Sequence, residues 1–246
     1  TNYHGAHPSL DRVIFYSQPD KERSWARLLA GKTDLALGID PQDYERINRY
    51  RGRFHFNTSV EPFRILILYN IHSPLFADLR GRLAVANAID KEHLTKNILK
   101  GMGMVPSGTM GYYSPFRNPA LQAIPHEPEK SLRLLHEAGW TYTQDGNRLW
   151  KEGIDFEFNL LFFQENQLHE TIAQYIRLCL NDIGIRVHLQ PVPFDKLVQS
   201  YYRNDAFHAV LTEFIDIRDD YDFLRELWSP VNGGAAVGGL FEDPHV

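Results

Sequence analysis

Charged residues follow the last strand that the sequence predicts, residues 207–214. The cluster starts with Asp216 and Arg218 and continues with three further aspartates, Asp219, Asp220 and Asp222. In open α/β sheets, ligands collect at the carboxyl ends of strands, where a charged side chain can pair with an oppositely charged ligand. A solvated turn that caps a helix over residues 221–227 explains the same cluster equally well.

Two adjacent tyrosines, Tyr112 and Tyr113, lie in a long segment without sustained periodicity, residues 102–125. The glycines and prolines of this segment predict a loop, and long loops in compact domains are often functional. The tyrosines could form an aromatic wall of a binding site. They could equally cover the hydrophobic core.

No motif that carries catalysis is present. Gly101 and Gly103, the close glycine pair in mid-chain, follow a helix rather than a strand, which is the wrong context for a dinucleotide site. His4 and His7 have no neighbouring cysteine to complete a metal site, and Cys179 lies on the apolar stripe of a helix, where packing is its expected role. We therefore expect no enzymatic activity, no cofactor and no bound metal.

The composition is that of a globular protein. The chain has 246 residues, of which 43% are hydrophobic and 13% aromatic, with a single cysteine. These values exclude a disordered chain and a disulfide scaffold. No apolar run reaches the roughly 18–20 residues that a membrane span requires.

Acidic residues outnumber basic ones, 31 to 26, and both are scattered along the chain. The densest basic stretch, within residues 46–53, lacks the glycines and aromatics of an RNA-binding signature. We therefore expect no nucleic-acid partner.

Strand and helix periodicities alternate along the chain and predict an α/β fold. The front section is expected to contain strands at residues 13–15 and 34–37 and helices at residues 20–30 and 41–48. Residues 63–69 are apolar on both faces apart from Arg64 and predict a central strand that is covered on both sides. The remaining expected elements are helices over residues 78–89, 91–100, 128–138, 168–183 and 195–203, and strands over residues 154–160, 185–189 and 207–214.

A set of short motifs recurs in one order along nearly the whole chain. It includes Leu-Ala-Gly-Lys-Thr-Asp-Leu-Ala over residues 29–36, Asn70 with Pro74, the Ala-Ile-Asp-Lys segment over residues 88–91, and Leu-Leu-x-x-Ala-Gly-Trp over residues 134–140. In this order the motifs resemble the family 5 extracellular solute-binding proteins, the peptide- and nickel-binding components of ABC importers. Gly81, inside a predicted helix, departs from the usual valine of this family.

The resemblance implies an α/β lobe of the type II periplasmic-binding-protein class, with a mixed sheet and flanking helices, in an incomplete two-lobe architecture. Residues 1–60 would be part of lobe I and residues 61–246 would be lobe II without its C-terminal part. The implied function is capture of a peptide or similar small solute by lobe closure and its delivery to the permease subunits in the inner membrane. A periplasmic or lipid-anchored location and a monomeric state follow as expectations.

The resemblance and the strand-end position together nominate five ligand-binding residues: Arg64, Tyr112, Phe214, Asp216 and Arg218. Asp216 would suit a ligand ammonium group and Arg218 a ligand carboxylate. The alternative function is that of the effector-sensing domain of a transcriptional regulator. A helix-turn-helix ahead of residue 1 would indicate the regulator, and a signal peptide or lipobox would indicate the importer.

Overall fold

The computed structural model describes residues 5, 9–37, 43, 49–50, 52–57, 63–108, 110, 112, 114–115, 117–202 and 207–215. The chain forms two compact units, residues 1–54 and 55–246. The helices predicted over residues 41–48 and 221–227 fall almost entirely outside the described residues.

The first unit contains the helix α1, Lys21–Leu29, where the sequence predicted one. Asp20 caps its start by accepting a hydrogen bond from the backbone N–H of Arg23 at 3.2 Å. Gly31 follows the last turn with φ of 67°, a conformation that favours glycine. The buried residues Trp25 and Leu28 form the apolar side of the helix.

The two strands predicted in this unit, residues 13–15 and 34–37, are wrong. Both segments are irregular in the structure, and their apolar side chains are exposed, with Phe15 at 87% and Leu37 at 81%. A strand satisfies its backbone N–H and C=O groups through a neighbouring strand. The described residues of this unit supply no such neighbour.

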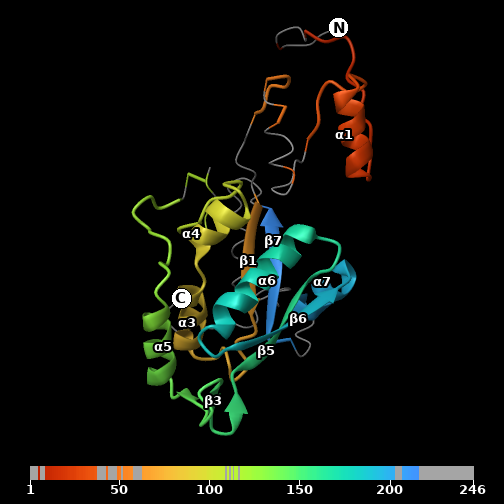
Figure 1. Ribbon diagram of the computed structural model, residues 1–246. Helices are drawn as coiled ribbons and strands as arrows, with labels where there is room; N and C mark the ends of the chain where they lie inside the picture. The colour runs from red at the N-terminus through yellow and green to blue at the C-terminus, as the bar shows by residue number, and fades with distance from the viewer. Residues whose placement is uncertain are drawn as a thin grey trace. The chain divides into compact units, whose positions relative to one another are not determined.

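The second unit is built on a four-stranded mixed sheet in the order β1-β7-β5-β6 (Figure 1). The strands are β1, Phe63–Tyr69; β5, Glu157–Phe163; β6, Arg186–Val192; and β7, Ala209–Ile215. The strands β5, β6 and β7 run parallel, whereas β1 runs antiparallel to β7. The predicted α/β class with a mixed sheet and flanking helices is thereby confirmed.

The prediction that residues 63–69 form a central strand is wrong in one respect. Among the described strands, β1 pairs with β7 alone and lies at the edge of the sheet. Its apolar residues nevertheless pack on both faces, Ile65 and Ile67 on one and Leu66 and Leu68 on the other. The sequence pattern reports cover on the two faces of a strand and says nothing about its two edges.

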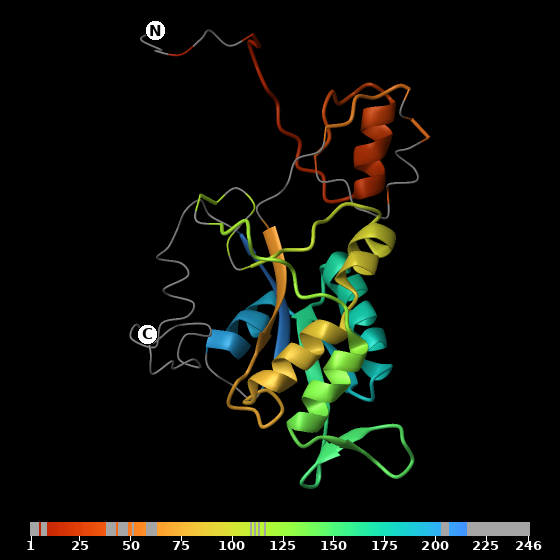
Figure 2. The ribbon, with the colours of Figure 1, turned by 90° about the vertical axis from the view of Figure 1, so that its left-hand side faces the viewer.

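Helices cover both faces of this sheet (Figure 2). On one face lie α3, Leu79–Ala88; α5, Pro128–Glu137; and α6, Gln167–Asn181. Their buried side chains form the main core together with the strand residues Phe158, Leu160 and Leu211. On the other face α7, Phe194–Tyr202, packs Leu197 against Leu161 and Val210. All four helices were predicted, with ends within two residues of those observed.

The helix predicted over residues 91–100 is shorter than expected. It begins as α4, Lys91–His93, and continues as the π-helical η2, Leu94–Ile98, in which the N–H of Leu99 donates to Leu94 O at 2.8 Å. Lys100 and Gly101 then adopt positive φ angles of 52° and 78°. The wider π turn and these two residues end the helix.

The strand predicted over residues 154–160 is two strands in two sheets. Ile154–Asp155 is β4, the last strand of a small antiparallel sheet with β2, Thr141–Tyr142, and β3, Leu149–Lys151. Phe156 separates it from β5 and is 1% exposed. Its N–H donates to Leu149 O at 2.7 Å and its carbonyl accepts from the N–H of Arg186 at 3.0 Å, so this residue joins the two sheets.

Candidate ligand-binding site

The carboxyl ends of β5, β6 and β7 lie at the same end of the sheet because the three strands are parallel. The antiparallel β1 starts at this end of the sheet, where Phe63 is paired with Ile215. The helices α6 and α7 begin within a few residues of the ends of β5 and β6. Strand ends and helix N-termini therefore meet at this end of the sheet, which is the usual location of ligands in such sheets.

Two of the nominated residues, Arg64 and Phe214, are brought together. Their positions are paired directly across β1 and β7, one residue from the end of the pairing. Arg64 is half-buried and lies on the same side of β1 as Leu66 and Leu68. A guanidinium group is thus held close to the strand end at which a ligand is expected.

Tyr112 lies in the predicted loop, which contains no helix or strand within its described residues. The loop connects η2 to α5 (Figures 1 and 2). The Tyr112 ring is 50% exposed, and the guanidinium carbon of Arg117 lies 5.2 Å from its centroid. Its role as a ligand-binding residue stays a prediction, and Asp216 and Arg218 lie outside the described residues.

His169 and Glu213, a pair that the sequence analysis did not nominate, lie at the same end of the sheet. His169 is in the first turn of α6 and is 2% exposed, and its Nε2 lies 3.5 Å from Oε2 of Glu213 on β7. Glu213 falls on the face of β7 that carries Ala209 and Leu211. A charged residue at an inward position of an apolar strand is the signal that could have identified it.

Neither ring nitrogen of His169 has a hydrogen-bond partner among the described residues. An unsatisfied buried polar group costs about 1–3 kcal/mol. Burial lowers the pKa of His169, and the nearby Glu213 carboxylate partly opposes this shift. The imidazole is therefore neutral at pH 7 and can hold a proton on either nitrogen.

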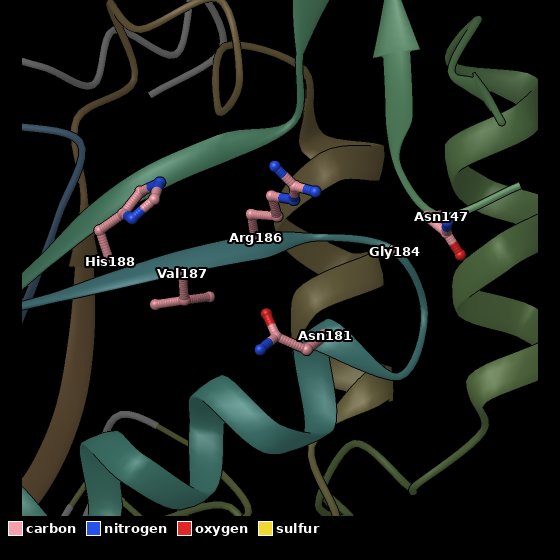
Figure 3. A pocket seen from close by; sticks show the side chains of 6 residues that line it. All are labelled: Asn147, Asn181, Gly184, Arg186, Val187 and His188. Atoms are coloured by element: carbon pink, nitrogen blue, oxygen red, sulfur yellow. The ribbon is translucent and has the colours of Figure 1, made fainter. Parts of the chain in front are cut away.

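A hollow of about 360 Å³ lies at the opposite end of the sheet, where β6 begins. It is lined by Asn147, Asn181, Gly184, Arg186, Val187 and His188 (Figure 3). Arg186 and His188 project to one side of β6 and the buried Val187 to the other. This hollow belongs to the connection between α6 and β6 and is separate from the strand ends that carry Arg64 and Glu213.

Within the described part of the chain, no helix has the length and apolar character needed to cross a membrane. The same residues contain no group of three or more His, Cys, Asp or Glu side chains arranged to hold a metal ion. Cys179 is half-buried and packs against the main core, as its position on the apolar stripe predicted.

Comparison with curated proteins gives relatives among bacterial binding proteins. The chain is 28% identical over 201 residues to the oligopeptide-binding protein AppA of Bacillus subtilis, covering 80% of this chain and 36% of AppA. It is 25% identical over 191 residues to the nickel-binding periplasmic protein of Escherichia coli, covering 76% of this chain and 36% of that protein. The chain thus spans little more than a third of the length of these relatives.

Solved structures share the fold. NikA from Brucella suis, in complex with Fe(III)-EDTA, superposes with a TM-score of 0.79 at 23% identity, covering 90% of this chain and 45% of NikA. AppA from Bacillus subtilis, in complex with a nonapeptide, gives a TM-score of 0.76 at 23% identity and covers 93% of this chain and 45% of AppA. The predicted fold, a lobe of a type II periplasmic binding protein, is confirmed.

The model of the family described as bacterial extracellular solute-binding proteins, family 5 Middle, matches residues 1–235. The match extends over both compact units and includes every residue nominated for the site. The resemblance drawn from the short motifs is therefore confirmed, and the chain belongs to the family 5 bacterial extracellular solute-binding proteins.

Proposed function

We propose that this chain is part of the substrate-binding component of an ABC importer, which captures a peptide or similar small solute and delivers it to a membrane permease. Membership of the family over residues 1–235 supports this role. One named relative is an oligopeptide-binding protein and another is a nickel-binding protein, so the names of the relatives favour transport over transcriptional regulation.

The observation that carries the proposal is the pairing of Arg64 with Phe214 at the end of the sheet where three parallel strands end. A cationic guanidinium group at the ends of these strands suits a ligand carboxylate. We infer that Arg64, Tyr112, Phe214, Asp216 and Arg218 contact the solute. A peptide offers the carboxylate, ammonium and apolar groups that these side chains complement.

In the whole protein, residues 1–60 would belong to lobe I and residues 61–246 to lobe II. Two compact units that divide at residue 54 are compatible with this boundary. Binding would proceed by lobe closure, in which the solute stabilises the closed form by contacts to both lobes. The protein would act as a monomer without catalytic activity, in the periplasm or anchored by a lipid at the outer face of the membrane.

Native mass spectrometry tests this function on the complete protein, purified without refolding from the organism that makes it. We expect an additional mass of a few hundred daltons that is released on denaturation and fragments as a peptide. A released metal chelate would keep the transport role and overturn the peptide assignment. A ligand-free protein that also binds none of a set of di- to pentapeptides in calorimetry would contradict the proposal.

Variants of the complete protein test the nominated residues. We expect Asp216→Ala and Arg218→Ala each to weaken peptide binding at least about tenfold, which corresponds to about 1.4 kcal/mol. Arg186→Ala, at the opposite end of the sheet, is the matched control and should leave the affinity unchanged. Unchanged affinity in both site variants would remove them from the site.

A further inference from the structure

His169 is an exception to the rule that buried polar groups are hydrogen-bonded. It is 2% exposed, and both ring nitrogens lack a hydrogen-bond partner among the described residues. Its backbone N–H, by contrast, is satisfied by Oδ1 of the cap residue Asn166 at 3.1 Å. The side chain is thus held by packing in a position where its ring has unused capacity for hydrogen bonds.

The group nearest to this ring is the carboxylate of Glu213. The separation of 3.5 Å between Nε2 and Oε2 exceeds the 2.7–2.9 Å that is typical of a charge-assisted hydrogen bond. Glu213 is 42% exposed, so its carboxylate has room both to move toward His169 and to meet a ligand. Within the part of the chain that the structure describes, His169 is its one ionic partner.

Other charged groups around α6 have partners or lie farther along the helix. On α6 itself, Glu170 accepts a hydrogen bond from Gln174, and Tyr175, six residues beyond His169, stacks on His93 of α4. Lys91 of α4 donates hydrogen bonds to the carbonyl oxygens of Ala86 and Ile89.

The remaining elements packed on α6 are α3, β5 and β6. On α3, Arg80 pairs with Asp78, and Arg82 donates to Phe76 O. The strand residues that face α6 from β5 and β6 are apolar, and they are Phe158, Leu160, Phe162, Val187 and Leu189. Among the residues that the structure describes, Glu213 is therefore the charged group positioned to act on His169 from the neighbouring elements.

We propose that Glu213 binds a cationic group of the solute, such as an ammonium group, and that His169 competes for this carboxylate when it is protonated. The assignment rests on the proposed function, because it places Glu213 beside Phe214 and opposite Ile65 at the proposed ligand-binding end of the sheet. It adds a second recognition group there and makes binding depend on pH.

The competition follows from charge. When His169 is neutral, the Glu213 carboxylate keeps its charge available to the solute. When His169 gains a proton, both ring nitrogens become donors, and Nε2–H can form a charge-assisted hydrogen bond to the carboxylate. A bound cation neutralises the same carboxylate and disfavours the proton on His169, so solute and proton oppose each other.

The pair itself is tested without any ligand, on the full chain. The His169 ring is followed by NMR from pH 4.5 to 8 and assigned by its loss in His169→Gln. We expect Glu213→Gln to shift the titration of His169 to lower pH, because it removes the nearby negative charge, whereas Glu170→Gln should not. His208, whose pKa is also lowered by burial, serves as an internal reference. An identical titration in wild type and Glu213→Gln would overturn the pair.

Binding is tested by calorimetry with trialanine and N-acetyl-trialanine, which lacks the ammonium group. We expect wild type to prefer trialanine at least tenfold at pH 7.5, Glu213→Gln to lose this preference, and the preference to fall at pH 5.5 in wild type but not in His169→Gln. A Glu213→Gln variant that keeps the preference would overturn the ligand assignment. If wild type binds neither tripeptide, that assignment falls together with the peptide function, and the NMR titration decides the pair independently.

Discussion

Similar apolar segments are irregular in the first compact unit and form a strand in the second. Residues 13–15 in the first unit read Val-Ile-Phe, and residues 63–69 in the second read Phe-Arg-Ile-Leu-Ile-Leu-Tyr, which is apolar apart from Arg64. The first run stays irregular with exposed side chains, whereas the second forms β1 and packs on both faces. The difference shows that strand propensity becomes a strand only when a paired neighbour and a covering layer are available.

The largest contrast should come from removing one aromatic ring in each unit. Phe158 is 2% exposed and meets the ring of Phe76 edge-on at 5.1 Å between centroids. We expect Phe158→Ala to lower the free energy of unfolding by about 3–5 kcal/mol, because it leaves a cavity in the core. Phe15→Ala, at an 87% exposed site, should change it by less than about 0.5 kcal/mol.

Urea unfolding, followed by tryptophan fluorescence, measures both variants. Similar losses in the two proteins would show that Phe15 is buried in solution and that the contrast between the units is not real.

A smaller contrast should come from adding a methyl group to one glycine in each unit. A Cβ at Gly81 would lie 2.8 Å from the carbonyl oxygen of Leu75, so backbone atoms would have to shift. We expect Gly81→Ala to destabilise the second unit by about 1–3 kcal/mol despite the better helix propensity of alanine. Gly52→Ala meets nothing within 4 Å and is the matched control.

Thermal unfolding of the two glycine variants measures this prediction. A stabilised Gly81→Ala protein would mean that Leu75 can move away from α3, and the close approach would then not explain why glycine stands at this position.

Loss of a helix cap should have a similar cost in the two units and so marks what they share. Asp78 accepts from the N–H of Arg80 at 2.8 Å, and Asp20 accepts from the N–H of Arg23 at 3.2 Å. We expect Asp78→Ala and Asp20→Ala each to cost about 1 kcal/mol in stability. Asparagine at either position keeps the acceptor and should restore most of the loss, which denaturant titration can measure. Equal losses in the Ala and Asn variants would exclude capping as the cause.

The smallest effect should be a pH dependence that arises from two histidines of the second unit. Burial lowers the pKa of His169 and of His208 in the folded protein below the ordinary value of about 6.5. Between the folded and unfolded values the unfolded chain binds more protons, so stability should fall as the pH decreases from 7.5 to 5. Glu213→Gln should enlarge this loss, and His169→Gln should reduce it.

Denaturant unfolding at several pH values measures these slopes. A Glu213→Gln protein with the same slope as wild type would show that the carboxylate does not act on His169.

Several residues of the family motifs have local roles that explain their place in the sequence. Asn70 ends β1, and its Nδ2 donates to Phe207 O at 3.0 Å, which joins the end of β1 to the start of β7. Gly139 follows α5 with φ of 90°, as the rule for helix C-termini predicted. Such local rules are readable in the sequence because they depend on near neighbours in the chain.

The candidate site was only partly accessible to this reasoning. The position of Arg64 as a charged residue in an apolar strand was visible, and the structure pairs it with Phe214. The meeting of His169 with Glu213 was not visible, because they lie 44 positions apart in the chain with a β-α unit between them. Asp216 and Arg218, the charged residues with the clearest sequence signal, stay predictions.

By itself the sequence determined the helices α1, α3, α5, α6 and α7, the α/β class and the family, because periodicity, capping residues and ordered motifs are local and additive signals. Only the tertiary structure decided that β1 is an edge strand, that Phe156 divides one predicted strand between two sheets, and that two apolar segments of the first unit stay unpaired. It also decided which charged groups meet at the strand ends. These features depend on which distant segment lies alongside, and pairing between strands is a property of two segments that neither one encodes alone.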